Sequence, residues 1–99
     1  MRFEDKTVFD EILFELLRAE KKFPNWPRDP VHGVAIMMEE AGEAIQAAID
    51  FYYKREETPE KLRKELLQTA AMATRMIIFV DKHKLKQEKS NDQIEHISF

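Results

Sequence analysis

Apolar residues recur at helical spacing along three stretches of the chain. The first covers about residues 7–22, the second about 31–54, and the third runs from Pro59 to about His83 or Lys84. Because residues three and four apart share a face of an α-helix, each stretch predicts a helix with one apolar side. These sides are formed by Val8, Phe9, Ile12, Leu13, Leu16 and Leu17, then by Val34, Met37, Ala41, Ala44, Ile45, Ala48 and Tyr52, and finally by Leu66, Ala70, Ala73, Ile77 and Val80.

Prolines and a capping residue mark where these helices begin and end. Pro24 ends the first helix, just after two lysines that suit the negative end of a helix dipole. A proline-rich loop covers residues 23–30. Thr58 is a suitable N-cap for the third helix, and Pro59 fits its first turn.

No stretch of the chain alternates with the period of a β-strand, and glycines for hairpin turns are lacking. The sequence therefore predicts an all-α protein with one domain over residues 1–99, a helical bundle of three long helices whose core spans about 7–84. Residues 86–99 are polar except for Ile94, Ile97 and Phe99. We interpret 85–99 as a short docking segment or a loose tail.

Composition and charge narrow the function classes. The chain has 43% hydrophobic and 35% charged residues, no cysteine and a net charge of −3. The start lacks the apolar run of a signal peptide, and no apolar run could span a bilayer, so we expect a soluble cytoplasmic protein with no membrane partner. The scattered basic residues argue against a nucleic acid polymer as partner, but not against a mononucleotide. Two glycines are too few for a glycine-rich phosphate loop.

The middle of the third helix is apolar nearly all round. Ala71 and Ile78 extend the apolar surface beyond the main side, next to Met72, Met76 and Phe79. An isolated three-helix bundle cannot bury such a helix, and large exposed apolar patches mark interfaces. The sequence therefore predicts a homo-oligomer.

Carboxylates lie on the flanks beside the main apolar sides. Glu40 and Glu43 are three residues apart in the second helix, and Glu65 and Gln68 have the same spacing in the third. We expect Glu40, Glu43 and Glu65 to converge where the two flanks meet. The apolar residues on these flanks are Ile36, Ala47 and Phe51 in the second helix and Leu62, Met72, Met76 and Phe79 in the third.

Converging carboxylates need a counter-charge. Two of them about 6 Å apart repel by roughly 3 kcal/mol at an effective dielectric constant of about 20, so the group would share protons or hold a cation. Mg²⁺ or Mn²⁺ fits, because the chain offers oxygen ligands and no cysteine or suitably placed histidine. A ferritin-like di-iron site would need Glu-x-x-His pairs, which are absent here. Glutamates three apart are also common on solvated helices, so a solvated face stays open as the alternative.

Together the acids resemble the motif of the all-α nucleoside triphosphate pyrophosphatases, the superfamily of MazG-like proteins and dimeric dUTPases. That motif is E-E-x-x-E on one helix and E-x-x-D on the next. Residues 39–43, Glu-Glu-Ala-Gly-Glu, match the first half, and 65–68, Glu-Leu-Leu-Gln, match the second except at Gln68. Residues 31–34 and 70–73 also fit the small single-domain members, so the resemblance covers roughly residues 9–84.

The resemblance implies hydrolysis of a (d)NTP to the (d)NMP and pyrophosphate, dependent on Mg²⁺, in a homodimer or homotetramer. It implies that Glu40, Glu43 and Glu65 are metal ligands, with Gln68 in the position of the family's Asp. Glu39 would be an accessory acid that orients or activates water, so Glu39 and Glu40 are the candidate catalytic residues. Such catalysis depends on charge neutralisation and on a water placed for in-line attack.

Gln68 is the departure from this pattern. Its amide oxygen can coordinate a cation, but it is neutral and cannot act as a base. Weaker metal binding, one ion instead of two, or reduced activity would follow, unless a subgroup uses Gln by design. The alternative function is a non-catalytic oligomeric helical interaction module with a vestigial metal site.

Four further residues are candidates for substrate binding. Trp26 could stack on a nucleobase or cap the end of the bundle. His32, at a helix start, could contact a base or phosphate or be structural. Lys61 and Arg75 flank the Glu65 side and could pair with phosphates, although basic residues on helices are usually solvated. The sequence does not determine base or sugar preference.

Overall fold

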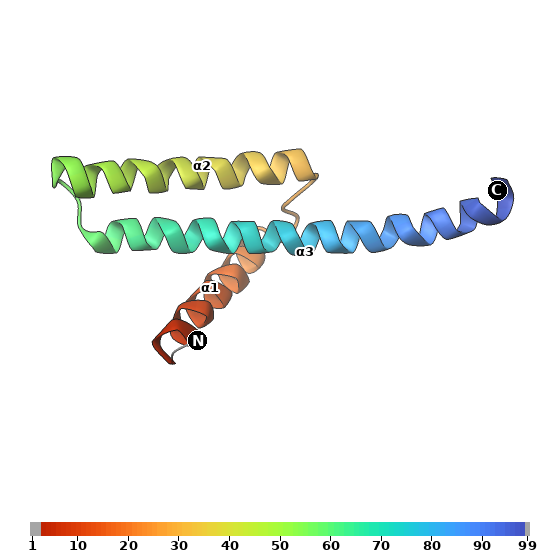
Figure 1. Cartoon of the computed structure of the whole chain (residues 1–99), viewed down its shortest axis with the longest axis horizontal. Helices are drawn as coiled ribbons and strands as arrows, with labels where there is room; N and C mark the ends of the chain where they lie inside the picture. The colour runs from red at the N-terminus through yellow and green to blue at the C-terminus, as the bar shows by residue number, and fades with distance from the viewer. Residues whose placement is uncertain (1–2, 99) are drawn as a thin grey trace.

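The structure, a computed structural model, describes the backbone of residues 3–98 and the side chains of residues 5–83. It consists of the α-helices α1 (Phe3–Lys22), α2 (Pro30–Ile49) and α3 (Pro59–Ser98), with the short π-helix η1 (Asp50–Lys54) directly after α2 (Figure 1). Residues 3–98 contain no strand, which confirms the predicted all-α class.

The helices form a hairpin and a crossing helix (Figure 1). α2 and α3 lie side by side and antiparallel, joined by the link after η1. α1 crosses α3 obliquely and packs on it, whereas it has little contact with α2. α3 is therefore the element that holds the other two in place.

α1 ends at Lys22, as predicted. Arg75 of α3 contacts the last turn of α1. The guanidinium of Arg75 donates hydrogen bonds to the carbonyl oxygens of Ala19 (3.2 Å) and Phe23 (2.6 Å). A cation at this end interacts favourably with the helix dipole, and it adds a second donor to carbonyls that already accept from the N–H groups of Phe23 and Trp26. Because Arg75 is itself buried, it fixes the point where α1 crosses α3.

α2 begins at Pro30, one residue before the predicted start, with Asp29 as its N-cap. The Asp29 side chain accepts a hydrogen bond from the backbone N–H of His32 (2.7 Å). Gly33 is buried in the first turn, where a Cβ would overlap Sδ of Met76 and lie 2.9 Å from Cβ of Pro27. The start of α2 thus packs directly on α3 because position 33 has no side chain.

The sequence pattern predicts one continuous helix through Lys54, but the α-helix ends at Ile49 and η1 follows. Arg55 closes η1 in the left-handed conformation, with φ 58°. The N–H groups of Arg55 and Glu56 both donate to the carbonyl of Asp50, which widens this turn. Apolar spacing does not distinguish a single π-helical turn from an α-helical one, so the sequence could not predict this change.

α3 begins at Pro59, as predicted, and Oγ1 of Thr58 accepts a hydrogen bond from the N–H of Lys61 (3.4 Å). The helix continues to Ser98, so the predicted end near residue 83 or 84 is wrong. The predicted end followed the loss of apolar spacing, which does not stop a helix rich in Lys, Glu and Gln. No Gly or Pro follows Pro59. The prediction that 85–99 docks or forms a tail concerns side chains outside the described residues.

The buried side of the α2–α3 pair takes in part of the acid-bearing flank, and it leaves the large residues of the main apolar side exposed. Within α2 and α3, the buried residues are Gly33, Ala44, Ala47, Glu65, Ala71, Arg75 and Met76. The large apolar residues that remain exposed on the other side include Val34, Met38, Ile45, Tyr52, Leu66, Ile77 and Val80. We call this exposed set the outer stripe. It is offset by about one residue, or 100° of helix rotation, from the buried set.

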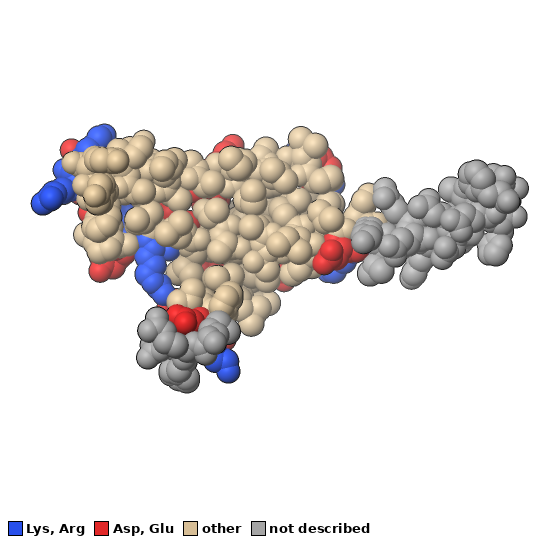
Figure 2. Space-filling view, viewed as in Figure 1, with Lys and Arg blue, Asp and Glu red and all other residues tan. Residues whose placement is uncertain are grey.

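The outer stripe leaves the chain with a small core and a large apolar surface. No large side chain in the described part of the chain is fully buried, and α1 also exposes Val8, Phe9, Leu13, Phe14 and Leu17. The face of the α2–α3 pair in Figure 2 carries few charged residues between its ends. Among the described residues, no helix is long and apolar enough to cross a membrane.

Candidate metal centre

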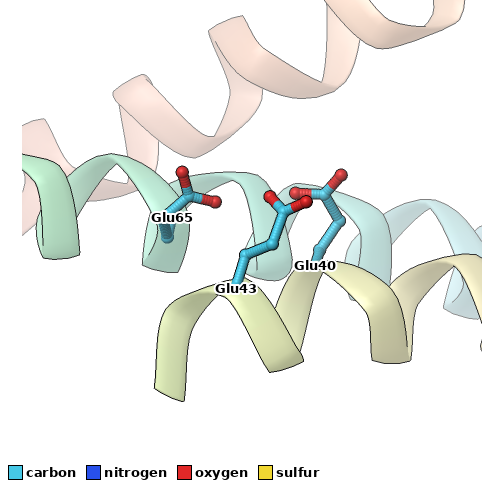
Figure 3. A group of neighbouring side chains, drawn as sticks. All are labelled: Glu40, Glu43 and Glu65. Atoms are coloured by element: carbon cyan, nitrogen blue, oxygen red, sulfur yellow. The ribbon is translucent and has the colours of Figure 1, made fainter. Parts of the chain in front are cut away.

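Three carboxylates meet between α2 and α3 (Figure 3). Glu40 and Glu43 come from successive turns of α2, and Glu65 comes from α3. One oxygen of each lies within 4.8 Å of the others, which confirms the predicted convergence. Three hard oxygen donors at this spacing are suited to a divalent cation such as Mg²⁺ or Mn²⁺.

The three carboxylates differ in burial, and two of them have oxygens that lack partners. Glu65 is 3% exposed, Glu40 is partly buried and Glu43 is exposed. Oε2 of Glu40 and Oε2 of Glu65 are both buried and have no hydrogen-bond partner. A buried carboxylate oxygen without a partner is destabilising, because the desolvation of the charge is not offset. A bound cation or a proton would offset this cost.

The cluster disfavours its own negative charge. Burial raises the pKa of Glu40 above its usual value, and the charges of Glu43, Glu65 and Glu39 raise it further. Glu39 is exposed and precedes Glu40 in the sequence, and its role as an accessory acid stays a prediction. A cation bound between the acids would counter the same repulsion that now favours a proton on Glu40.

Lys61 contacts the cluster directly. Its ammonium lies 3.1 Å from Oε1 of Glu65, one turn along α3. The hydrogen bond to Glu65 and the charge of that carboxylate raise the pKa of Lys61. Glu65 thus has one oxygen paired with Lys61 and one without a partner.

Gln68 lines a pocket of about 160 Å³ together with Glu40, and α1 forms the opposite wall. The α1 residues at this pocket include Glu15, Arg18 and Lys22, and Arg18 pairs with Glu15 at 2.9 Å. The acidic motif gave no indication that α1 contributes to the site. Glu15, Arg18 and Lys22 share one face of a helix, which is the signal that could have indicated it.

Trp26 and His32 lie at a second pocket of about 310 Å³ beside the first. Both pockets are lined by Lys22 and Phe23, so they adjoin at the end of α1. Nε1 of Trp26 and Nδ1 of His32 are buried without a hydrogen-bond partner. This pocket therefore combines an aromatic ring with the cations Lys22 and Arg28, while the two unsatisfied nitrogens are buried in its wall.

Arg75 is placed differently from the other candidates. Its guanidinium bonds the two α1 carbonyls and lies 5.0 Å from the centre of the Trp26 ring. Burial lowers the pKa of Arg75. These contacts use the guanidinium to join α1, the loop and α3, which fits a structural role.

No family model, curated protein or solved structure matches the chain in the comparisons with known proteins. The likeness to the MazG-like proteins therefore depends on the acidic motif and its placement.

Proposed function

We propose that this protein is a nucleoside triphosphate pyrophosphohydrolase that depends on Mg²⁺ and converts a (d)NTP and water to the (d)NMP and pyrophosphate. The observation that carries this proposal is the pair of buried, unpartnered oxygens on Glu40 and Glu65 within the three-carboxylate cluster. Glutamates on a solvated face would have water around both oxygens. The resemblance to the MazG-like motif gives the same residues their roles.

Glu40, Glu43 and Glu65 would hold Mg²⁺, or Mn²⁺, with the amide oxygen of Gln68 as a neutral donor. The bound ion would neutralise phosphate charge and lower the pKa of a water molecule. Glu39 would orient the attacking water, and either Glu39 or Glu40 would accept its proton. Because Gln68 removes one negative charge from the family pattern, the site suits one ion better than two.

The two adjoining pockets offer places for the two ends of a nucleotide. The phosphates would lie near Glu40, where Arg18, Lys22 and Lys61 supply positive charge. The base would reach the second pocket, which Trp26 and His32 line and where the Trp26 ring would be a stacking surface. Arg75 would act indirectly by holding Trp26 in place.

The outer stripe and the exposed apolar side of α1 support a homo-oligomeric enzyme, a dimer or tetramer. Exposed apolar surfaces of this extent are typical of interfaces, which supports assembly through them. The enzyme would act on the cytoplasmic nucleotide pool.

Pyrophosphate release from a panel of NTPs and dNTPs, with and without Mg²⁺, tests the proposal. We expect turnover of at least one nucleotide and a loss of about 100-fold or more in Glu40→Gln. Glu56→Gln is the matched control, because Glu56 is exposed and lies outside the cluster. Absence of turnover for every nucleotide, with Mg²⁺ binding unchanged in Glu40→Gln, would show that the enzyme proposal is wrong.

Gln68 is the observation that favours a second function, a non-catalytic oligomeric interaction module with a vestigial metal site. Gln68→Asp separates the two readings of this residue. Higher turnover in Gln68→Asp would indicate that the natural protein has lost activity. Lower turnover would indicate that the site has adapted to the amide.

A further inference from the structure

Glu65 and Lys61 form an unequal pair. The side chain of Glu65 is 5% exposed and that of Lys61 is 48% exposed. The carboxylate is held between the helices, while the ammonium stands at the end of a flexible stem in contact with solvent. Only one member of the pair can leave without exposing a buried charge, and that member is Lys61.

The ammonium also occupies the position of a counter-ion. It is the cation that pairs with Glu65 at 3.1 Å, and the other oxygen of Glu65 is buried without a partner. A divalent cation on the same carboxylate would repel the ammonium, because both carry positive charge and share one anion. The two cations therefore compete for Glu65.

We propose that Lys61 is a built-in counter-cation of the cluster, which pairs with Glu65 when no metal is bound and is released when a divalent cation binds. This inference rests on the proposed function. The released ammonium remains on the same turn of α3, beside the carboxylates, and can then pair with a substrate phosphate. Metal binding therefore comes before phosphate binding, because it releases the ammonium that can pair with the phosphate.

The test measures Mn²⁺ affinity by electron paramagnetic resonance on the full chain, without nucleotide. Lys61→Met removes the charge and keeps the apolar stem, and we expect it to bind Mn²⁺ about fivefold more tightly than the natural protein. Lys64→Met is the matched control: Lys64 is exposed on the same helix, and the described residues show no ion pair to it. Its Mn²⁺ affinity should stay within about twofold of the natural value.

Two further measurements test whether the charge of Lys61 and its pairing with Glu65 cause the change in Mn²⁺ affinity. Lys61→Arg keeps the charge, so it should bind Mn²⁺ no more tightly than the natural protein. Thermal melting without metal should show a lower melting temperature in Lys61→Met than in Lys64→Met, and Mn²⁺ should remove that difference. Equal Mn²⁺ affinity in Lys61→Met and Lys64→Met, or tighter binding in Lys61→Arg, would overturn the exchange.

Glu40→Gln distinguishes failure of this inference from failure of the proposed function. If the natural protein binds Mn²⁺, Glu40→Gln loses it and Lys61→Met is unchanged, the metal site stands and only the exchange is wrong. If no variant binds Mn²⁺ saturably, the metal site is wrong and the exchange is wrong with it.

Discussion

The two sides of the α2–α3 pair are opposite in character to those of an ordinary helical hairpin. The inner side holds charged groups, among them Glu40, Glu65 and Arg75, set among small residues such as Ala44 and Ala71. The outer side holds the large apolar residues. Burial of apolar area drives folding. A chain that stayed monomeric would therefore be expected to bury the large apolar residues and expose the charged ones. This contrast is the basis for proposing a metal site on the inner side and an oligomer contact on the outer side.

The outer side gives the largest expected effect. If copies of the chain pack through the outer stripe, Ile77→Asp places a charge in an apolar interface, and we expect the oligomer to weaken by about 4 kcal/mol, close to a thousandfold. Ile77 is 62% exposed in the single chain, so the monomer fold should tolerate the change. Analytical ultracentrifugation over a concentration series measures the shift. Ile77→Met, which keeps the apolar character, should assemble normally.

Arg75 is the second test, on the inner side. Arg75→Met removes the two hydrogen bonds from the guanidinium to the carbonyls of Ala19 and Phe23, and we expect about 3 kcal/mol less stability in urea unfolding. Arg63→Met is the matched control, because Arg63 forms an exposed ion pair with Glu11. Its unfolding midpoint should change little. Similar losses in both variants would contradict the structural role of Arg75.

The pH dependence of the metal-free protein tests the charge on the inner side. The pKa of Glu40 is raised in the folded state, so the folded protein holds this proton more tightly than the unfolded chain. The stability that results is complete below the unfolded pKa and is lost as pH rises through the folded pKa. Melting in chelator should therefore show the natural protein gaining stability on acidification, relative to Glu40→Gln. A parallel pH profile in the two proteins would mean that Glu40 is not desolvated.

The sequence was sufficient for the existence of the three helices and for the pairing of Glu40 with Glu43, because both depend on spacing within one helix. The end of α3 and the π-helical turn η1 are not coded by that spacing. The sequence did not determine which of two helical stripes on α2 and α3 would be buried. Both stripes repeat at intervals of three and four, one through Val34, Met38 and Ile45 and the other through Gly33, Glu40 and Ala44. They differ by one residue, and the choice depends on contacts between helices. The contribution of Arg18 on α1 has the same origin, because the crossing angle sets it.

The smallest expected effect concerns the two glycines of α2, of which Gly33 is buried and Gly42 is exposed. Gly42 has no atom within 4 Å of where a Cβ would lie, so Gly42→Ala should stabilise the single chain by about 1 kcal/mol through helix propensity. Gly33→Ala gains the same propensity but forces the buried Met76 to move, so it should be destabilising. Urea unfolding at low protein concentration measures both. If Gly42→Ala instead weakens assembly, another copy approaches the helix at Gly42, and the interface extends from the outer stripe to the edge of the acidic cluster.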